Sequence, residues 1–600
     1  MEPRDFLSGS AFGTDWWTSP RQYGVVVERD VRVRMSDGVH LSCDIFRPDA
    51  NERFPVILGC HPYESKAQTA PIRPGPLSTT RWRNPGQERT NASLEAGDPY
   101  FFARRGYVHV ICNVRGTGRS EGLWQFMGRR EIQDVCALIQ WIRQQPWCNG
   151  RVGMFGVSYF ARIQLFVAAE HPEGLTCLFC PWASTDFYRD VMYRGGILAY
   201  EWLLGWSRTS LSYAGCRPAN HSKAMLGERA YRQAVQELLE DEDLGGVPEL
   251  RSVLERPEEG IHPFIVDVLL HPLYDSFWRE RSARLEEIEI PAYLGGDWGI
   301  FGLHLPGAFR SWQRIRGPKK MLIGPPVYLD RPLYQLHFEA LRWFDFWLKD
   351  LETRILEEPP IRLFIIGLQD WREATDWPVP GTRWIPFFLH EGGLLLDREP
   401  FGEEGSDAWE DSPWFRGSLE YVTPPMVETT EIVGPMVLVL RAASTDEEIF
   451  WIASVYREDR TGNRTLLTRG WLRGSQRHVD WEASCPWEVH HPHDRREPLR
   501  PGEVYEFFLN IVPTGVRLGP GERLRLKLSG VEDPATNPLE VIGSGSLRRQ
   551  SPSRITVFRN ARHPSFLLVP VTRGNLLGSF VSGGLWPGGS GRTDSKGGGW

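Results

Sequence analysis

Apolar runs of strand length alternate with helix-like segments along the first third of the chain. Four such runs are FPVILGCHPY, GYVHVICNVRG, VGMFGVSYF and LTCLFCPWAS. Between the second and the third run, Ile132, Val135, Ile139 and Ile142 recur at the spacing of one helix face. A second helical segment, ARIQLFVAAEHPEG, follows the third run. Strands that alternate with helices predict a parallel sheet with helices on its faces, which is the α/β class.

A predicted hairpin precedes this strand–helix alternation, and a predicted insertion interrupts it. Residues 24–48 alternate apolar and polar side chains around a Ser-Asp-Gly turn, which predicts a β-hairpin. Residues 187–285 are helix-like and rich in charged and aromatic side chains, so we expect an inserted helical cap. The strand–helix alternation resumes with IPAYLGG, LPGAFRSWQRI and KKMLIGPP, and the amphipathic segment LHFEALRWFDFWLKD is expected to close the domain.

The pattern changes again after residue 357. Short apolar segments, of which IRLFIIG is the first, are separated by Gly, Pro and Asp turns, which is typical of an all-β sandwich. The last residues are rich in Gly and Ser, so we expect a disordered tail. The predicted division is an α/β domain over 1–186 and 286–356, a helical cap over 187–285, a β-sandwich over 357–580 and a tail over 581–600.

Composition narrows the class of protein. The chain has 600 residues, 41% of them hydrophobic and 24% charged, as expected for several globular domains. The net charge of −7 argues against a nucleic-acid binder held by bulk charge. We find no apolar segment long enough for a membrane span and no secretory signal. Nine scattered cysteines, including the pair Cys177 and Cys180, favour reduced, buried thiols in a cytoplasmic protein over a redox or metal site.

The segment Gly156-Val157-Ser158 lies where a predicted strand meets a predicted helix. A serine at such a turn, two residues after a glycine, is the nucleophile-elbow pattern, because the sharp turn lifts the hydroxyl clear of the sheet. The N–H of Tyr159 would then point at the same place and bind an oxyanion. The usual glycine at the fifth position is replaced by Phe160, so an ordinary turn serine remains an alternative.

Several longer segments carry a family resemblance. DGVHLSCDIFRPD, HPYESK, NVRGTGRSEG and QPWCNGRVGMFGVSY resemble the cocaine-esterase-like (CocE/NonD) and X-Pro dipeptidyl-peptidase (S15) hydrolases. The resemblance covers about residues 24–575, with Ala161 where the family has a glycine. It implies an α/β-hydrolase domain with a helical cap and a C-terminal jelly roll of the galactose-binding type. It also implies a small-molecule ester or amide substrate and no cofactor or metal.

Three residues match the family's catalytic pattern. Ser158 matches the nucleophile, Tyr159 would supply a backbone N–H, and Tyr63 matches the tyrosine whose hydroxyl is the second oxyanion donor. A phenol suits that role because it donates a hydrogen bond without carrying charge. A packed loop tyrosine is the alternative for Tyr63. Arg119, in RGTGRSEG, is expected to brace a loop rather than to touch substrate.

The family's acid and base are not found at their expected positions. The aspartate position falls on Gly299 or Ile300, although Asp297 is close enough to reach inward from a shifted loop. The histidine position is held by Tyr328, and no histidine lies between residues 305 and 336. A tyrosine with a pKa near its ordinary value is a weak general base. Without an oriented base, a serine hydroxyl is a poor nucleophile.

Other residues are weaker candidates for these roles. His304 is expected at a helix start, His337 in the closing helix, and His61 on the oxyanion side. His490, His491 and His493 have a metal-like spacing, but their Pro-rich context favours a solvated loop. Asp186 follows the strand after the elbow helix, another place where a hydrolase acid is found.

The sequence therefore supports three hypotheses. The first is a serine hydrolase that forms an acyl-enzyme on Ser158, provided that a base is supplied. The second is a pseudo-hydrolase, or a non-hydrolytic catalyst of small-molecule metabolism that uses the oxyanion donors with Tyr328 as a proton donor. The third is a binding protein without catalysis. In each case we expect no nucleic-acid or membrane partner, while a homo-oligomer is left open.

Overall fold

The computed structural model describes residues 18–65, 95–326, 332–401, 405–533 and 545–574. The expected Gly/Ser tail over 581–600 and the N-terminal segment 1–17 lie outside these residues. None of the described helices is long and apolar enough to cross a membrane.

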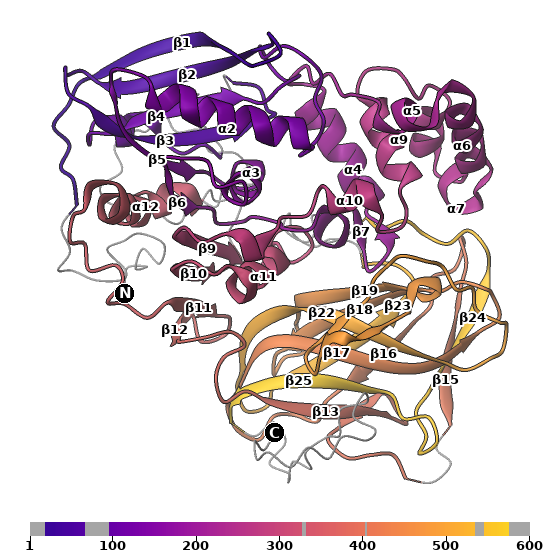
Figure 1. Cartoon of the computed structure of the whole chain (residues 1–600). Helices are drawn as coiled ribbons and strands as arrows, with labels where there is room; N and C mark the ends of the chain where they lie inside the picture. Colours follow the sequence, from indigo (N-terminus) through magenta and orange to yellow (C-terminus); the bar gives the residue numbers. More distant parts are fainter. Residues whose placement is uncertain (1–17, 66–94, 327–331, 402–404, 534–544, 575–600) are drawn as a thin grey trace.

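The first sheet is mixed, with a parallel centre (Figure 1). Among the described residues its ten strands lie in the order β1-β2-β4-β3-β5-β6-β9-β10-β11-β12. The strands are β1 (Val25–Arg34), β2 (His40–Pro48), β3 (Phe54–His61), β4 (Val108–Asn113), β5 (Cys148–Phe155), β6 (Leu175–Phe179), β9 (Ala292–Asp297), β10 (Lys319–Gly324), β11 (Ile361–Ile365) and β12 (Asp370–Ala374). The predicted hairpin is β1–β2, with Arg34 opposite His40. Strands β4, β3, β5, β6, β9 and β10 run parallel to one another, so their carboxyl ends meet at one edge.

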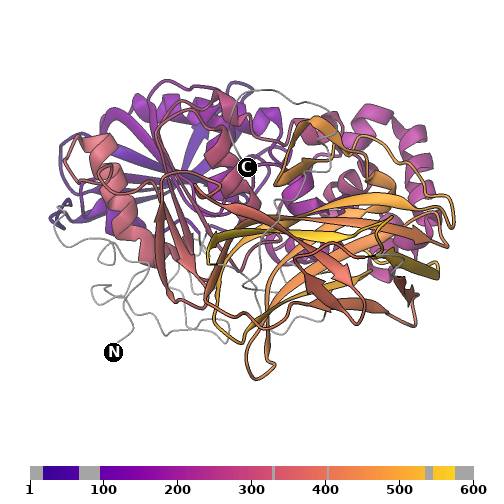
Figure 2. The ribbon, with the colours of Figure 1, turned by 90° about the horizontal axis from the view of Figure 1, so that it is seen from below.

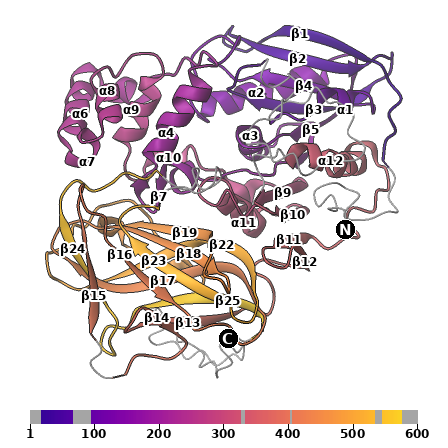
Figure 3. The same ribbon diagram turned by 180° about the vertical axis from the view of Figure 1, so that it is seen from behind.

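Helices cover both faces of this sheet. They are α1 (Pro99–Ala103), α2 (Arg129–Arg143), α3 (Tyr159–Ala168), α11 (Leu305–Arg314) and α12 (Pro332–Lys349). Leu341 and Phe344 of α12 pack with Phe155 and Phe179 in one apolar cluster, whereas Ile139 and the rest of the predicted α2 face belong to another. Because side chains alternate along a strand, the two clusters lie on opposite faces of the sheet. Figure 3 shows α12 from behind, beside β5 and β9.

The interval between β6 and β9 contains the insertion. Its helices are α4 (Tyr200–Trp206), α5 (His221–Leu226), α6 (Glu228–Glu240), α7 (Glu242–Gly245), α8 (Pro248–Leu254), α9 (His262–Leu270) and α10 (Ser276–Arg279). Two π-turns, η2 (Tyr188–Met192) and η3 (Ser207–Leu211), a short hairpin, β7 (Tyr193–Arg194) and β8 (Ile197–Leu198), and a 3-10 turn, η4 (Leu285–Glu287), complete it. The helices α5 to α9 gather at one side of the molecule (Figures 1 and 3).

The second sheet closes on itself and forms a barrel-like β domain. Its strands are β13 (Arg383–His390), β14 (Leu394–Leu396), β15 (Ser406–Asp411), β16 (Ser418–Val422), β17 (Thr430–Ser444), β18 (Phe450–Glu458), β19 (Arg464–Arg473), β22 (Tyr505–Leu518), β23 (Arg523–Ser529), β24 (Ser553–Phe558) and β25 (Phe566–Arg573). Strand β17 pairs with both β22 and β25, which closes the ring. A small hairpin, β20 (Asp480–Cys485) and β21 (Glu488–His490), lies beside it, and Figure 2 shows the two sheets side by side.

One strand assignment is corrected by the structure. IRLFIIG was expected to begin the β-sandwich, yet β11 pairs in parallel with β10, with Ile361 opposite Met321. Strand β12 then adds antiparallel to β11, so both extend the first sheet. An apolar run predicts a strand but not its partner, and β10 would otherwise present an unpaired edge. The β domain therefore begins with β13 rather than at residue 357.

Candidate active site

Ser158 stands on a strained turn between β5 and α3. Its backbone has φ 60° and ψ −117°, a conformation that a non-glycine residue rarely adopts. The turn is closed by a hydrogen bond from the Phe160 N–H to the Val157 carbonyl, 3.1 Å long. Gly156 has φ 135°, and a Cβ there would lie 2.4 Å from the Cβ of Phe160. The predicted strand–serine–helix turn is confirmed, with Ser158 partly exposed at its apex.

Phe160 takes the place of the motif's last glycine because the opposite strand leaves room for a ring. A Cβ on Gly59, in β3, would lie 3.0 Å from Phe160 Cδ1. The same ring stacks on His61 with 4.7 Å between ring centroids. Close packing of α3 on the sheet is therefore retained, with the glycine on the strand instead of the helix.

Tyr63 lies beside Ser158, directly after β3. Its N–H donates to His61 Nδ1 at 3.1 Å, and its carbonyl accepts from Asn113 Nδ2 at 2.8 Å. Burial raises the pKa of Tyr63 far above its ordinary value, and the charge of Glu95 adds to this, whereas side-chain hydrogen bonding with Trp206 and Ser158 opposes it. The phenol is thus neutral at physiological pH, and the structure brings Tyr63 and Ser158 together, as the sequence predicted.

Tyr159 contributes differently through its two ends. Its side chain is buried, and the hydroxyl donates to Glu131 at 2.5 Å while accepting from Trp124 Nε1 at 3.1 Å. Burial raises the pKa of Glu131 to about 7. Tyr159 is also the first residue of α3, and the first N–H groups of a helix have no intrahelical acceptor. Anchoring of the side chain therefore holds this N–H at the turn, where an oxyanion would lie.

Two charged residues near the elbow were missed by the sequence analysis. Arg162 is buried one turn after Ser158, where its Nε donates to Ser184 Oγ at 2.8 Å and its guanidinium lies 4.0 Å over the Phe187 ring. Burial lowers the pKa of Arg162 to about 10, so it stays cationic. The four-residue spacing from Ser158 was the signal that could have found it.

Glu95 is the second missed residue, and the sequence on either side of it contains no recognisable motif. Its side chain is buried, and its backbone carbonyl accepts from the Val157 N–H at 3.1 Å. Its charge raises the pKa of Tyr63 and supports the charge of Arg162. The carboxylate of Glu95 therefore acts by charge on both the Tyr63 phenol and the Arg162 guanidinium, from a segment separate from theirs.

Asp297, the tentative acid, is occupied by its own loop. It ends β9 and is 1% exposed. One carboxylate oxygen accepts from Trp182 Nε1 at 2.5 Å, and the other accepts from the N–H groups of Gly299 and Ile300 at 2.7 and 3.2 Å. Burial raises the pKa of Asp297 to about 7. These contacts hold the turn after β9. Tyr328, the residue at the family's histidine position, lies outside the described residues.

The histidines considered as replacements are buried among packing contacts. His337 Nε2 accepts from the Asp98 N–H at 2.9 Å, and its ring lies 5.0 Å from that of Phe101. His304 occupies the N-cap position of α11, and burial together with the charge of Arg162 lowers its pKa well below the ordinary value. Burial lowers the pKa of His61 to about 3. His61 and His304 are therefore neutral at physiological pH.

The histidines after β20 contradict the expectation of a solvated loop. His491 and His493 are buried, 6% and 5% exposed. His491 Nδ1 and Nε2 lie 2.9 and 2.8 Å from the carbonyl oxygens of His478 and Phe508, and His493 Nδ1 lies 2.8 Å from Gln476 Oε1. Polar and Pro-rich sequence suggested exposure, but the segment packs where the β domain meets the first domain. Within the described ranges no group of three or more potential ligands is placed to hold a metal ion.

The remaining candidates have local roles. Cys177 and Cys180 are buried free thiols in and directly after β6. Asp186 accepts from Arg189 Nη1 at 2.6 Å. Arg119 braces its loop, as predicted, through its carbonyl to Arg32 and its guanidinium to Asp44.

Comparison with known proteins gives two family matches. Residues 37–327 match the X-Pro dipeptidyl-peptidase (S15 family) model, and residues 354–568 match the X-Pro dipeptidyl-peptidase C-terminal non-catalytic domain. A cocaine esterase from Rhodococcus sp. (strain MB1 Bresler) is 26% identical over 91% of this chain and 99% of its own. An Xaa-Pro dipeptidyl-peptidase from Lactobacillus helveticus is 23% identical over 64% of this chain and 52% of its own.

A solved structure shares the fold. A CocE/NonD family hydrolase from Staphylococcus aureus is similar with a TM-score of 0.74 at 23% identity, over 92% of this chain and 94% of that one. The fold is accordingly an α/β-hydrolase domain followed by a β-rich C-terminal domain, as the sequence predicted.

Proposed function

The chain belongs to the X-Pro dipeptidyl-peptidase (S15) family of serine hydrolases, and on that premise we propose that it cleaves an ester or an amide through Ser158. The observation that carries the proposal is the position of Ser158 on a turn with φ 60°, beside the neutral phenol of Tyr63. A residue in a strained conformation is retained where the surrounding structure needs its side chain at that place.

The proposed reaction has two steps. Ser158 Oγ attacks the substrate carbonyl, and the Tyr159 N–H and Tyr63 hydroxyl donate to the oxyanion. The proton of Ser158 passes to a base and then to the leaving group, which departs as an alcohol or an amine. Water then attacks the acyl-enzyme, giving one proton to the base, and Ser158 regains a proton as the acid product leaves.

We assign the base to Glu95. The Glu95 side chain is buried, and its backbone carbonyl accepts a hydrogen bond from the N–H of Val157, the residue before Ser158. Its charge raises the pKa of Tyr63. A carboxylate removed from water is a stronger proton acceptor than an exposed one. Arg162 compensates the buried negative charge without itself accepting a proton. This arrangement would replace the imidazole that the sequence lacks at the family position.

The relatives' names supply the substrate class. The Rhodococcus relative is named as an esterase, and the Lactobacillus relative is named as an Xaa-Pro dipeptidyl-peptidase. We propose that esters are the faster substrates of this chain, because an ester carbonyl is less stabilised by resonance than an amide carbonyl and is attacked more easily. Side-chain hydrogen bonding of Trp206, in α4, with Tyr63 supports the proposal that the insertion contributes to the substrate pocket.

A fluorophosphonate probe tests the activated serine. We expect labelling of the wild type and none of Ser158→Ala, whereas Ser418→Ala, at an exposed position of β16, labels normally. Hydrolysis of p-nitrophenyl acetate should follow the same order. Ester cleavage retained by Ser158→Ala would exclude the acyl-enzyme and favour a non-hydrolytic or water-activating use of the oxyanion donors.

A further inference from the structure

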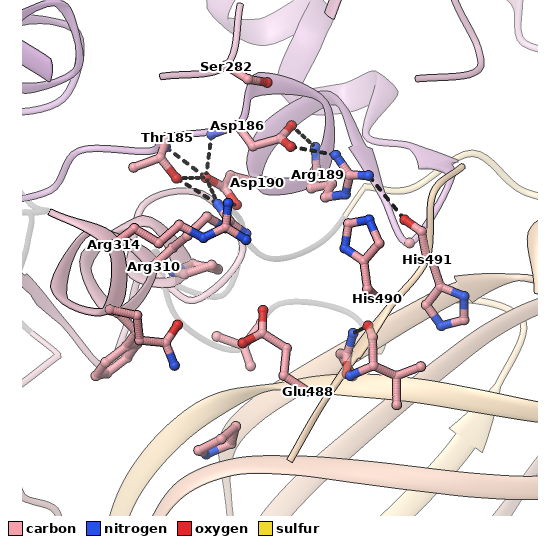
Figure 4. A pocket seen from close by; sticks show the side chains of 18 of the residues that line it. Thr185, Asp186, Arg189, Asp190, Ser282, Arg310, Arg314, Glu488, His490 and His491 are labelled. Atoms are coloured by element: carbon pink, nitrogen blue, oxygen red, sulfur yellow. Dashed lines mark hydrogen bonds and ion pairs between the residues drawn. The ribbon is translucent and has the colours of Figure 1, made fainter. Parts of the chain in front are cut away.

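A large cavity lies between the two sheet domains, away from the nucleophile (Figure 4). Its volume is about 790 Å³, within the range of small-molecule sites. One wall is formed by α11 and the segment around η2, and the other by β19, β21 and β22 of the β domain. Neither Ser158 nor Tyr63 lines it, so any ligand here is not bound as the hydrolysed substrate. We call it the interdomain cavity.

The α11 wall presents two guanidinium groups. Arg310 and Arg314 are four residues apart and therefore share a helix face. Arg310 Nη1 is held by both oxygens of Asp190 at 2.9 Å and by Thr185 Oγ1 at 2.7 Å. In the part of the chain that the structure describes, its Nε and Nη2 donate to no residue. Arg314 pairs loosely with Glu286 at 3.3 Å and is half exposed. Both side chains retain donors for an anionic group.

The β21 wall presents a carboxylate and an imidazole. Glu488 and His490 are two residues apart on a strand, so both point to the same side, into the cavity (Figure 4). Neither side chain makes a hydrogen bond or ion pair with any described residue. The charges of Asp190, Asp186 and Glu488 raise the pKa of Arg310. Burial lowers the pKa of His490 to about 4, and the charge of Arg314 adds a smaller contribution. The two walls are thus close enough to act on one ligand.

Between the charged walls the cavity is lined by aromatic rings. Phe309 stacks on Trp377 with 4.0 Å between centroids, and Phe301 lies against Trp471 at 6.4 Å. Such surfaces stabilise an apolar body by excluding water from it. A simple inorganic ion would make no use of these apolar surfaces.

We propose that the interdomain cavity binds a small zwitterion with an apolar body, of the α-amino acid class. Its carboxylate lies against Arg310 and Arg314, its ammonium against Glu488, and its apolar side chain between the aromatic rings. His490 supplies a neutral hydrogen-bonding group beside the ammonium. Because the two charged walls belong to different domains, such a ligand bridges them.

Three probes of one shape test the proposal by calorimetry on the full chain carrying Ser158→Ala. L-phenylalanine has both charges, 3-phenylpropionate lacks the ammonium, and 2-phenylethylamine lacks the carboxylate. We expect saturable binding of one L-phenylalanine per chain and at least about tenfold weaker binding of the other two, since each lost charge removes a charge-assisted hydrogen bond.

Variants of the cavity walls test which residue binds the ammonium of the probe and which binds its carboxylate. Glu488→Gln should weaken L-phenylalanine about tenfold and leave 3-phenylpropionate unchanged, whereas Arg314→Gln should weaken L-phenylalanine and leave 2-phenylethylamine unchanged. Glu482→Gln, at an exposed position of the neighbouring β20, is the matched control and should bind as the parent does. Glu488→Asp should restore part of the loss, which excludes misfolding of the Gln variant as the cause.

Three results would overturn the proposal. The first is the absence of heat and thermal shift with millimolar L-phenylalanine. The second is equal affinity for all three probes, which would mean that the charges play no part. The third is binding that survives both wall variants but is blocked by fluorophosphonate labelling of the wild type, which would place the probe in the Ser158 site. The first two results do not depend on whether Ser158 hydrolyses an ester, so they separate failure of this proposal from failure of the proposed function.

Discussion

The ring of Phe160 occupies the space that a side chain on Gly59 would need, with only 3.0 Å between a Cβ there and Phe160 Cδ1. The two residues belong to α3 and β3, which are far apart in sequence. Their contact explains how the elbow tolerates phenylalanine where the motif has glycine. The close approach of helix and strand requires one glycine, on the helix or on the strand, and in this protein the glycine is on the strand.

Gly59→Ala should therefore destabilise the elbow. We expect a loss of about 1–3 kcal/mol in stability, because the added methyl overpacks a buried contact, together with weaker fluorophosphonate labelling of Ser158. Thermal denaturation and gel fluorescence measure the two effects. Gly205→Ala is the control, since a Cβ there meets nothing within 4 Å and α4 gains a better helix former. Equal behaviour of the two variants would contradict the contact's role.

Tyr63→Phe should remove one oxyanion donor and keep the fold. Loss of a single such donor lowers kcat by about 10²- to 10³-fold, with little change in KM, because the hydrogen bond forms mainly in the transition state. Steady-state hydrolysis of p-nitrophenyl acetate measures this. Tyr213→Phe, at an exposed ring that is 75% accessible, should leave kcat unchanged. A rise in KM with unchanged kcat would instead mean that Tyr63 contributes to substrate binding.

Glu95→Gln should remove the base while keeping the shape of the side chain. We expect kcat to fall by about 10²- to 10⁴-fold and the acidic limb of the pH–rate profile to disappear, because the amide has no proton to lose. Glu237→Gln, on the exposed face of α6, is the control. An unchanged acidic limb in Glu95→Gln would show that another group accepts the proton.

Asp297 should make the protein less stable as the pH rises. Burial raises its pKa to about 7 from 3.8, so the folded state holds a proton that the unfolded state releases. The stabilising contribution is full below about pH 3.8 and is lost as the pH rises through 7. The slope for one group cannot exceed about 1.4 kcal/mol per pH unit.

Thermal midpoints between pH 5 and pH 8 check this. Asp297→Asn should show a shallower decline than the wild type, because the variant has no carboxyl to ionise. The exposed Asp49→Asn should decline as the wild type does. Parallel slopes for all three proteins would mean that Asp297 does not titrate in this range.

Local features were predictable because they depend on near neighbours in the chain. The turn at Ser158 follows from a glycine two residues earlier and from the apolar periodicities on either side. The β1–β2 hairpin follows from alternation around a Ser-Asp-Gly turn in the same way. The resemblance of HPYESK and QPWCNGRVGMFGVSY to one family extended these local patterns to the pairing of Tyr63 with Ser158.

Features that depend on distant partners were missed or misassigned. Glu95, in a loop without a motif, acts through its charge on Tyr63 and Arg162. The segment around His491 is polar in sequence, yet the side chains of His491 and His493 are buried. No pattern within these segments records what lies against them.

By itself the sequence determined the strands, the helices and the serine turn of this protein, since backbone preference and apolar periodicity act over a few residues. Only the tertiary structure decided which sheet β11 joins, which charges surround Ser158, and that Glu488 faces Arg310 across a cavity. The physical reason is that strand edges, buried charges and cavity walls obtain partners from segments that the local sequence pattern does not connect. Such pairings are settled by how whole layers pack, because each must satisfy the polar groups and fill the space left by the other.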